Sequence, residues 1–196
     1  ILFHGLYLGG VFYSISIGMP TSLAALIVTL QPILTNILSG PLLNEKVTFQ
    51  QWVGVLLGFA GASLVLGIDV GSGIPILGLI ATLIALLSIT FSTIWQKKLS
   101  NNLPLSVSNF YQAVGGCFFH IFVVIFFAKP YIAFTKTFFL AMGHQILLVS
   151  FGAFTILMFL IKKNSASKTV SIFFLIPATT ALMAWFFLKE SLTTID

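Results

Sequence analysis

The feature that constrains this chain most is a series of long apolar runs joined by short loops. The charged residues lie between these runs or at their ends. The runs cover residues 2–18, 22–43, 49–68, 74–96, 105–128, 140–161 and 166–188. A helix needs about 20 apolar residues to cross a bilayer, and only internally hydrogen-bonded segments are stable in lipid. The sequence therefore predicts an all-α membrane protein with seven transmembrane helices, because the alternating pattern of a membrane β-barrel is missing.

The composition excludes several other classes of protein. Charged residues make up 7% of the 196 residues, whereas a soluble domain carries about 25%. The net charge of +5 comes from scattered lysines without any arginine, which is not the charge pattern of a nucleic-acid-binding protein. One cysteine, Cys117, allows neither an intrachain disulfide nor a thiolate metal cage. We expect no metal, no other cofactor and no nucleic-acid partner.

The lysines predict the orientation in the membrane. The loops after the second, fourth and sixth runs hold six of them: Lys46, Lys97, Lys98, Lys162, Lys163 and Lys168. The other side holds three: Lys129, Lys136 and Lys189. Because cytoplasmic loops are enriched in lysine, we expect residue 1 on the cytoplasmic side. The first residue is Ile, and residues 193–196 (TTID) have the pattern of an N-cap, so we expect the sequence to be a fragment with helices missing at both ends.

The second and seventh runs are related by an internal repeat. Residues 21–51 and 166–196 share eight identities in 31 positions at an offset of 145. Pro32 aligns with Pro177, and Glu45 aligns with Glu190, each glutamate 13 residues after its proline. The second copy lies five runs after the first, an odd number, so it enters the membrane inverted. Inverted repeats are typical of secondary transporters that work by alternating access.

The region around Glu45 also has a structural interpretation. Thr48 and Gln51 form a capping box for the next helix, with Val47 and Trp52 placed as a hydrophobic staple. We therefore interpret Glu45 and its repeat partner as residues at helix ends, in preference to a role in substrate binding.

Two segments resemble a known transporter family. Residues 22–32 (SLAALIVTLQP), continuing through 43–48 (LNEKVT) to Gly54, Gly58 and Gly61, resemble the fourth and fifth helices of the EamA family of the drug/metabolite transporter superfamily. Residues 165–177 (SASKTVSIFFLIP) and 185–190 (WFFLKE) resemble its ninth helix.

The resemblance implies a ten-helix fold of two inverted five-helix halves, of which this chain supplies helices three to nine. Residues 1–68 would then be the last three helices of the first repeat, and 73–196 the second repeat without its last helix. The resemblance also implies transport of amino acids or related metabolites in a bacterial inner (plasma) membrane.

Pro32 and Pro177 lie near the middle of their runs and free the carbonyls of Val28 and Phe173 from helical hydrogen bonds. Proline-interrupted segments at corresponding positions of two inverted halves point to a transport site, although packing kinks give the same pattern. Polar residues on shared helical faces extend this candidate cavity, with helix packing as the alternative for each face. The candidate lining residues are Tyr13, Gln31, Pro32, Thr35, Ser92, Trp95, Gln112, Pro177 and Thr179.

The runs lack the basic clamps that phosphorylated substrates usually need. A neutral or zwitterionic metabolite fits better, with an ammonium group on an aromatic face. His120 is a candidate proton relay, but a hydrogen-bonded structural histidine is the alternative. Facilitated flux or exchange is our default mode of transport.

The leading prediction is therefore a secondary transporter, an exporter or exchanger of amino acids or similar metabolites. A seven-helix receptor and a non-transporting membrane scaffold are the alternatives. An intramembrane enzyme is disfavoured and no catalytic residue is expected, because neither paired carboxylates nor a base near a nucleophile is evident. The expected partners are the lipid bilayer and a small metabolite, and a homodimer is left open.

Overall fold

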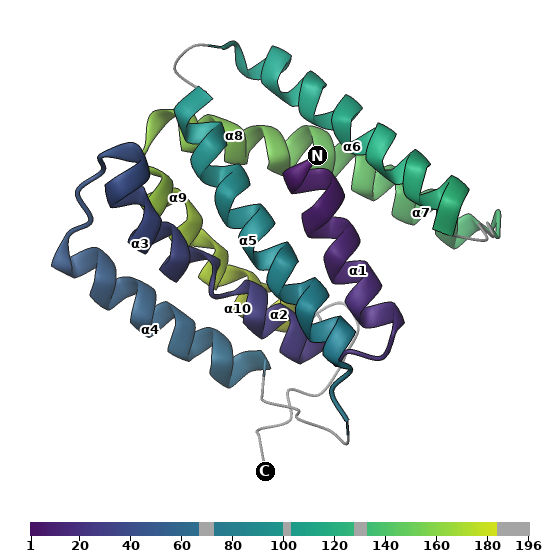
Figure 1. Cartoon of the computed structure of the whole chain (residues 1–196), viewed down its shortest axis with the longest axis horizontal. Helices are drawn as coiled ribbons and strands as arrows, with labels where there is room; N and C mark the ends of the chain where they lie inside the picture. The colour runs from purple at the N-terminus through teal and green to yellow at the C-terminus, as the bar shows by residue number, and fades with distance from the viewer. Residues whose placement is uncertain (67–72, 100–102, 128–132, 184–196) are drawn as a thin grey trace.

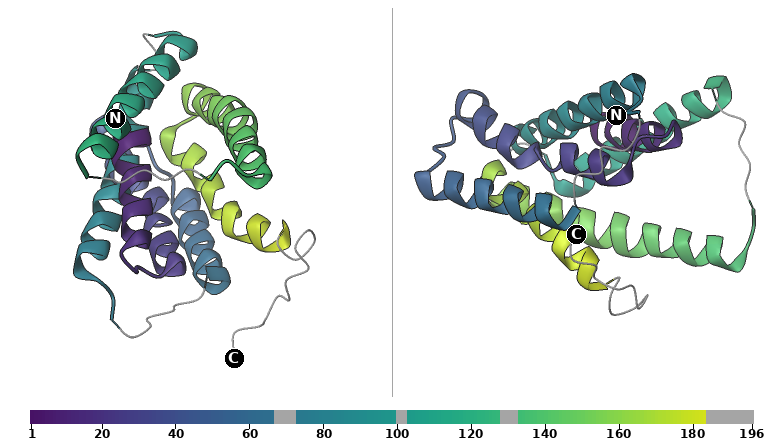
Figure 2. Two further views of the ribbon diagram at one scale, coloured as in Figure 1. Left: turned by 90° about the vertical axis from the view of Figure 1, so that its right-hand side faces the viewer. Right: turned by 90° about the horizontal axis from the view of Figure 1, so that it is seen from below.

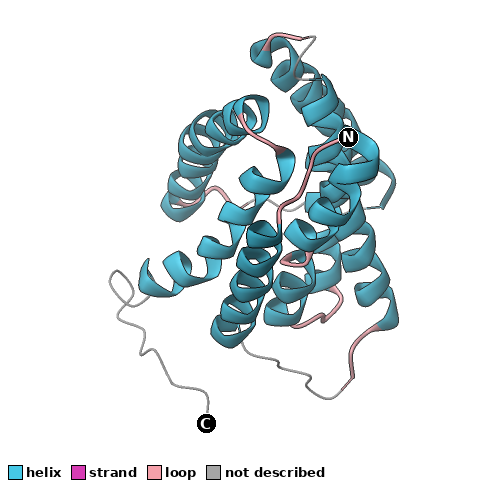
Figure 3. Ribbon diagram, turned by 90° about the vertical axis from the view of Figure 1, so that its left-hand side faces the viewer, coloured by secondary structure: helices cyan, strands magenta, loops and turns pink. Residues whose placement is uncertain are grey.

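The computed structural model describes residues 1–66, 73–99, 103–127 and 133–183. Some features of the sequence lie outside the described residues: Lys129, the segment 185–190 with Lys189 and Glu190, and the N-cap pattern at 193–196. The regular structure of the described residues is entirely helical (Figure 3). The predicted all-α fold class is confirmed.

Each of the seven apolar runs contains helix. In chain order the elements are η1 (Leu2–Tyr7), α1 (Leu8–Ser16), α2 (Thr21–Val28), α3 (Gln31–Leu43), α4 (Phe49–Leu66), α5 (Ile76–Leu99), α6 (Leu105–Phe127), α7 (Lys136–His144), η2 (Gln145–Ala153), α8 (Phe154–Lys163), α9 (Ala166–Ser171), η3 (Ile172–Phe174) and α10 (Leu175–Met183). Within the described ranges, five stretches are long and apolar enough to cross a membrane: Thr21–Leu43, Phe49–Leu66, Ile76–Leu99, Leu105–Phe127 and Lys136–Lys163.

The sixth run begins earlier than predicted, at Lys136 instead of residue 140. The reason is an N-cap: the Thr135 side chain accepts a hydrogen bond of 3.2 Å from the backbone N–H of Phe138. A capping hydroxyl satisfies a backbone donor that helix formation would otherwise leave without a partner. A count of apolar residues does not detect this contribution.

The predicted capping box at the start of α4 is confirmed. The Gln51 Oε1 atom accepts a hydrogen bond of 2.8 Å from the backbone N–H of Thr48. In return, the Thr48 Oγ1 atom accepts one of 3.3 Å from the backbone N–H of Gln51. These two reciprocal bonds define the box.

The helices form two layers, with α1, α3, α5 and α6 in one and α4, α8 and α10 in the other (Figure 2). Helix α5 packs against η1, α1, α2 and α3 and is the central helix. Half of the residues in the most apolar stretch of α5 are buried, whereas 6% of those in the corresponding stretch of α6 are. The aromatic side chains exposed along α6 are therefore the surface expected to face lipid.

One end of the bundle gathers the C-terminal ends of α3, α5 and α8 (Figure 1). The Ala166 N–H at the start of α9 donates a hydrogen bond of 3.0 Å to Glu45 Oε1, just beyond α3. Lys97 Nζ, near the end of α5, donates bonds of 3.3 Å to the Lys162 carbonyl and 2.6 Å to the Asn164 carbonyl. We call this the lysine end. Because the end of α3 and the start of α9 meet here, the two helices run antiparallel, as an inverted repeat requires.

Of the three glycines of α4, Gly58 makes a close helix contact. A Cβ atom at this position would lie 2.6 Å from Cδ2 of Phe174 in η3. Phe174 forms a small buried apolar cluster with Val55 and Ala62 of α4. Among the described residues, nothing lies within 4 Å of a Cβ built at Gly54 or Gly61, so close packing is local to Gly58.

Candidate functional site

The second apolar run is a broken helix. Helix α2 ends at Val28, and α3 begins again at Gln31. Between them the Leu30 N–H donates to the Ile27 carbonyl at 3.1 Å, three residues back instead of four. Pro32 causes the break, because its ring clashes with the carbonyl four residues earlier and it offers no N–H. Proline is tolerated in the first turn of α3, because backbone N–H groups in a first turn have no hydrogen-bond partner within their helix.

The seventh run breaks at the corresponding position. Helix α9 ends at Ser171, a 3₁₀ turn covers Ile172–Phe174, and α10 begins at Leu175, two residues before Pro177. Adding the repeat offset of 145 to Thr29 and Leu30 gives positions 174 and 175. The two breaks therefore overlap at position 174, to within two residues of the register that the sequence repeat predicts.

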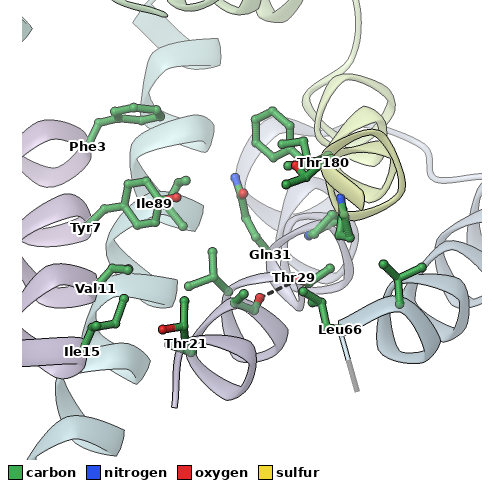
Figure 4. A pocket seen from close by; sticks show the side chains of 18 residues that line it. Phe3, Tyr7, Val11, Ile15, Thr21, Thr29, Gln31, Leu66, Ile89 and Thr180 are labelled. Carbon is green, nitrogen blue, oxygen red and sulfur yellow. Dashed lines mark hydrogen bonds between the residues drawn. The ribbon is translucent and has the colours of Figure 1, made fainter. Parts of the chain in front are cut away.

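A cavity of about 560 Å³ lies against both breaks (Figure 4). Three equivalent pairs of residues line it: Val28 with Phe173, Gln31 with Ile176, and Pro32 with Pro177. Another wall comes from the first run. Its lining residues, spaced by four so that they share one helical face, are Phe3, Tyr7, Val11 and Ile15. The volume falls within the range of small-molecule sites.

The polar groups of the lining are amides and hydroxyls, and no lining side chain is charged within the described part of the chain. Gln31 is 1% exposed, and its Nε2 donates a hydrogen bond of 3.1 Å to Thr93 Oγ1 on α5. Thr93 in turn donates to the Ile89 carbonyl at 2.9 Å. This chain of bonds fixes the Gln31 amide at the cavity wall.

Of the predicted site residues on the broken helices, Gln31, Pro32 and Pro177 line the cavity. Thr35 is buried one turn beyond Gln31, outside the lining. The Thr179 hydroxyl donates to the Leu175 and Ile176 carbonyls of its own helix, at 2.9 and 3.0 Å. Its neighbour Thr180 faces the cavity instead.

The structure places the other predicted site residues outside the lining. Tyr13 and Trp95 are 50% and 61% exposed, whereas Ser92 is buried. Gln112 Nε2 donates a hydrogen bond of 2.7 Å to Gln96 Oε1 of α5, which is the packing role considered as its alternative. His120 Nε2 is bonded at 2.7 Å to the His4 carbonyl and also lies outside the lining.

Comparison with known proteins settles the family. The model of the EamA-like transporter family matches residues 1–67 and 76–196. The chain belongs to the EamA-like transporter family. The "Uncharacterized transporter YvbV" of Bacillus subtilis (strain 168) is 27% identical over 203 residues, which cover 98% of this chain and 62% of that protein. The chain thus spans less than two thirds of the length of this relative.

Sequence reasoning missed the wall that the first run of this EamA-family chain contributes. It selected the face of Tyr13, because a polar residue in an apolar run usually points inward. The observed wall is mostly apolar, and Tyr7 is its one polar member. The four-residue spacing of Phe3, Tyr7, Val11 and Ile15 was the available signal, although a lipid-facing stripe has the same pattern.

The described residues of this EamA-family chain contain no group of three or more His, Cys, Asp or Glu side chains that could hold a metal ion. The chemistry that the cavity offers is hydrogen bonding from amides and hydroxyls, together with contact with aromatic faces. That chemistry suits reversible binding of a small organic molecule.

Proposed function

We propose that the chain forms the solute-binding part of a secondary transporter that moves amino acids or related neutral or zwitterionic metabolites by alternating access. One observation carries the proposal: the cavity lies where two inverted, proline-broken helices meet. Discontinuous helices at a repeat interface are where inverted-repeat transporters bind their substrates. Export or exchange is the proposed mode.

The uncharged lining supports the proposed class of solute. A phosphorylated solute would ordinarily pair with Arg or Lys. The Gln31 side-chain amide can donate to a carboxylate, and the ring of Tyr7 suits an ammonium group. Ile176, the repeat equivalent of Gln31, supplies an apolar surface for the remainder of the solute. A molecule with a polar head and an apolar side chain fits both walls.

The proposal extends to the setting of the chain. Residues 1–68 and 73–196 are proposed as parts of the two inverted halves, in a bacterial plasma (inner) membrane with residue 1 on the cytoplasmic side. The relative from Bacillus and the gathering of six lysines at one end support this setting. A homodimer stays a prediction, which chemical cross-linking in native membranes tests.

The test of function is a counterflow assay with the full-length protein in liposomes. Vesicles loaded with one unlabelled amino acid or metabolite at a time take up the labelled compound, with and without a pH gradient. We expect saturable exchange that survives collapse of the gradient. Strict dependence on the gradient would replace the proposed mode with proton coupling, and absence of exchange by folded protein would contradict the solute class.

A matched pair of variants links the assay to the cavity. Gln31→Ala and Gln112→Ala each remove an amide that is bonded to a side chain of α5, but only Gln31 lines the cavity. We expect Gln31→Ala to weaken the apparent affinity for the solute and Gln112→Ala to leave it unchanged. If both variants changed the apparent affinity equally, the solute would not bind in this cavity.

A further inference from the structure

The cavity reaches one end of the bundle and stops short of the other. Its lining includes Ile15 near the end of α1, Thr21 at the start of α2 and Leu66 at the end of α4. All three positions lie at the end opposite to the lysine end (Figure 1). None of its lining residues comes from the loops of the lysine end, as far as the described residues go. The lysine end is therefore closed in this structure.

A polar helix face connects the cavity to the closed end. The buried residues of α3 are Gln31, Pro32, Thr35, Asn36 and Ser39. This face packs against α5 and α9, where apolar side chains would pack without hydrogen-bonding requirements. Polar residues inside a membrane-spanning helix face a partner or a water-filled path. The polar side chains on this face of α3 are of the kind that lines a solute path. In this structure they are packed against α5 and α9, so the path is closed here.

Hydrogen bonds between the two halves of the repeat close this face at the lysine end. Ser167 Oγ of α9 donates to Asn36 Oδ1 of α3, and Gln51 Nε2 of α4 donates to Ser167 Oγ at 3.5 Å. Beside them, Glu45 Oε1 accepts the Ala166 N–H at 3.0 Å. Asn36 and Ser167 are 3% and 1% exposed. We call Asn36, Glu45, Gln51 and Ser167 the latch.

The latch is only partly satisfied in its closed form. Asn36 Nδ2 and Glu45 Oε2 are buried without a hydrogen-bond partner among the described residues, and so is Thr35 Oγ1 on the adjoining turn. Buried polar atoms without partners carry a cost that water removes when it reaches them. When the latch opens, the free energy gained by hydrating these atoms therefore offsets the free energy lost with the broken hydrogen bonds. A contact that must open and close needs closed and open forms of similar free energy. A permanently closed contact has no such requirement.

We propose that the latch is the gate at the lysine end, and that the polar face of α3 is the closed half of the solute path. When the latch parts, α9 separates from α3 and the cavity extends to the lysine end. The inference rests on the proposed function, because it assigns the closed half of an alternating-access cycle. It concerns residues that lie outside the cavity itself.

The first test measures accessibility and needs no solute. Cys117→Ser, together with replacement of every cysteine that the full-length protein carries outside residues 1–196, removes the native thiols, and Thr35→Cys then places a reporter on the polar face. The reagent is methanethiosulfonate ethylsulfonate, which does not cross membranes, applied to the full-length protein in right-side-out and inside-out vesicles. We expect Ser167→Ala to raise the labelling rate from the lysine end by roughly tenfold, because losing the latch bonds shifts the population toward the open form.

Ser171→Ala is the matched control. Ser171 lies on the same helix, and its hydroxyl donates to the Ser167 carbonyl at 2.9 Å, within that helix. This variant removes a serine hydroxyl from α9 and leaves the latch intact, so the labelling rate should not change. Equal rates in the two variants, or a rise from the opposite side only, would overturn the gate assignment.

A second experiment avoids dependence on a variant that weakens the fold. Asn36→Cys with Ser167→Cys, again in the background without native thiols, allows a disulfide across the latch. Complete oxidation should abolish counterflow, and reduction should restore it. Undiminished counterflow after complete cross-linking overturns the inference. If the reduced protein exchanges no solute, the proposed function fails, while the labelling experiment still decides whether the latch opens.

Discussion

The two broken helices agree in the position of their break and differ in the chemistry that they present. Both are interrupted just before an equivalent proline: the helix resumes one residue before Pro32 and two residues before Pro177. The first then offers the Gln31 amide to the cavity, where the second offers the side chain of Ile176. The two copies thus share their backbone geometry, but they differ in polarity: the wall with Gln31 is polar and the wall with Ile176 is apolar. The cavity therefore presents two walls of similar backbone shape and unequal polarity.

The largest effect is expected from removing either break. Pro32→Ala and Pro177→Ala restore an N–H and favour a continuous helix, since proline costs about 3 kcal/mol in a helix interior. Each should lower flux more than tenfold, a change that about 1.4 kcal/mol already produces, with the folded yield unchanged. The measurements are counterflow per amount of monodisperse protein and the yield itself. Equal losses in both would identify the prolines as packing kinks, and a loss from only one would break the equivalence of the two helices.

Exchanging the unequal positions sharpens the comparison next. Gln31→Ile copies the apolar wall into the first half and removes a hydrogen-bonding group worth about 1 kcal/mol. The apparent affinity should fall about fivefold to tenfold, measured from the concentration dependence of counterflow. Glu45→Gln, at the lysine end, should change this affinity less. The reverse order of the two variants would remove Gln31 from the site.

A smaller effect is expected from the wall that lies outside both broken helices. Tyr7→Phe keeps the ring and removes the hydroxyl at the cavity, so affinity should fall by a few-fold, in keeping with about 1 kcal/mol for one hydrogen bond. Tyr13→Phe removes the same group from a half-exposed side chain and should leave affinity unchanged. Parallel titrations of the two variants make the measurement. A loss in Tyr13→Phe alone would restore the face chosen from the sequence.

The smallest effect on transport is expected at the capping box. Thr48→Ala removes the hydroxyl that accepts the Gln51 N–H, which should lower stability by about 1 kcal/mol and leave flux per folded molecule unchanged. Thermal unfolding of the detergent-solubilised protein measures the first quantity and counterflow the second. Thr48→Ser keeps the cap and should retain the original stability. A fall in flux at constant folded yield would indicate that this cap takes part in transport.

The properties that depend on the length of apolar runs and on proline could be predicted from the sequence. The helical spans, the capping box at Thr48 and the interruptions near Pro32 and Pro177 follow from residues that constrain their own backbone. The inward faces could not be predicted as well, since lipid and protein interior are both apolar and give no contrast in hydrophobicity. Tyr13 and Trp95 were therefore chosen on polarity, while Phe3, Val11 and Ile15 escaped notice. The bonds of the latch join residues more than 100 positions apart, a separation that no local pattern encodes.

The close contact at Gly58 has a consequence for the shape of the cavity. Phe174, which leaves no room for a side chain at position 58, directly follows Phe173 in the cavity wall. A methyl group added at position 58 would have to displace the side chain of Phe174. Position 58 lies outside the cavity lining and is linked to it through Phe174 and its neighbour Phe173. A substitution at position 58 is therefore a way to change the shape of the cavity without replacing any residue of its lining.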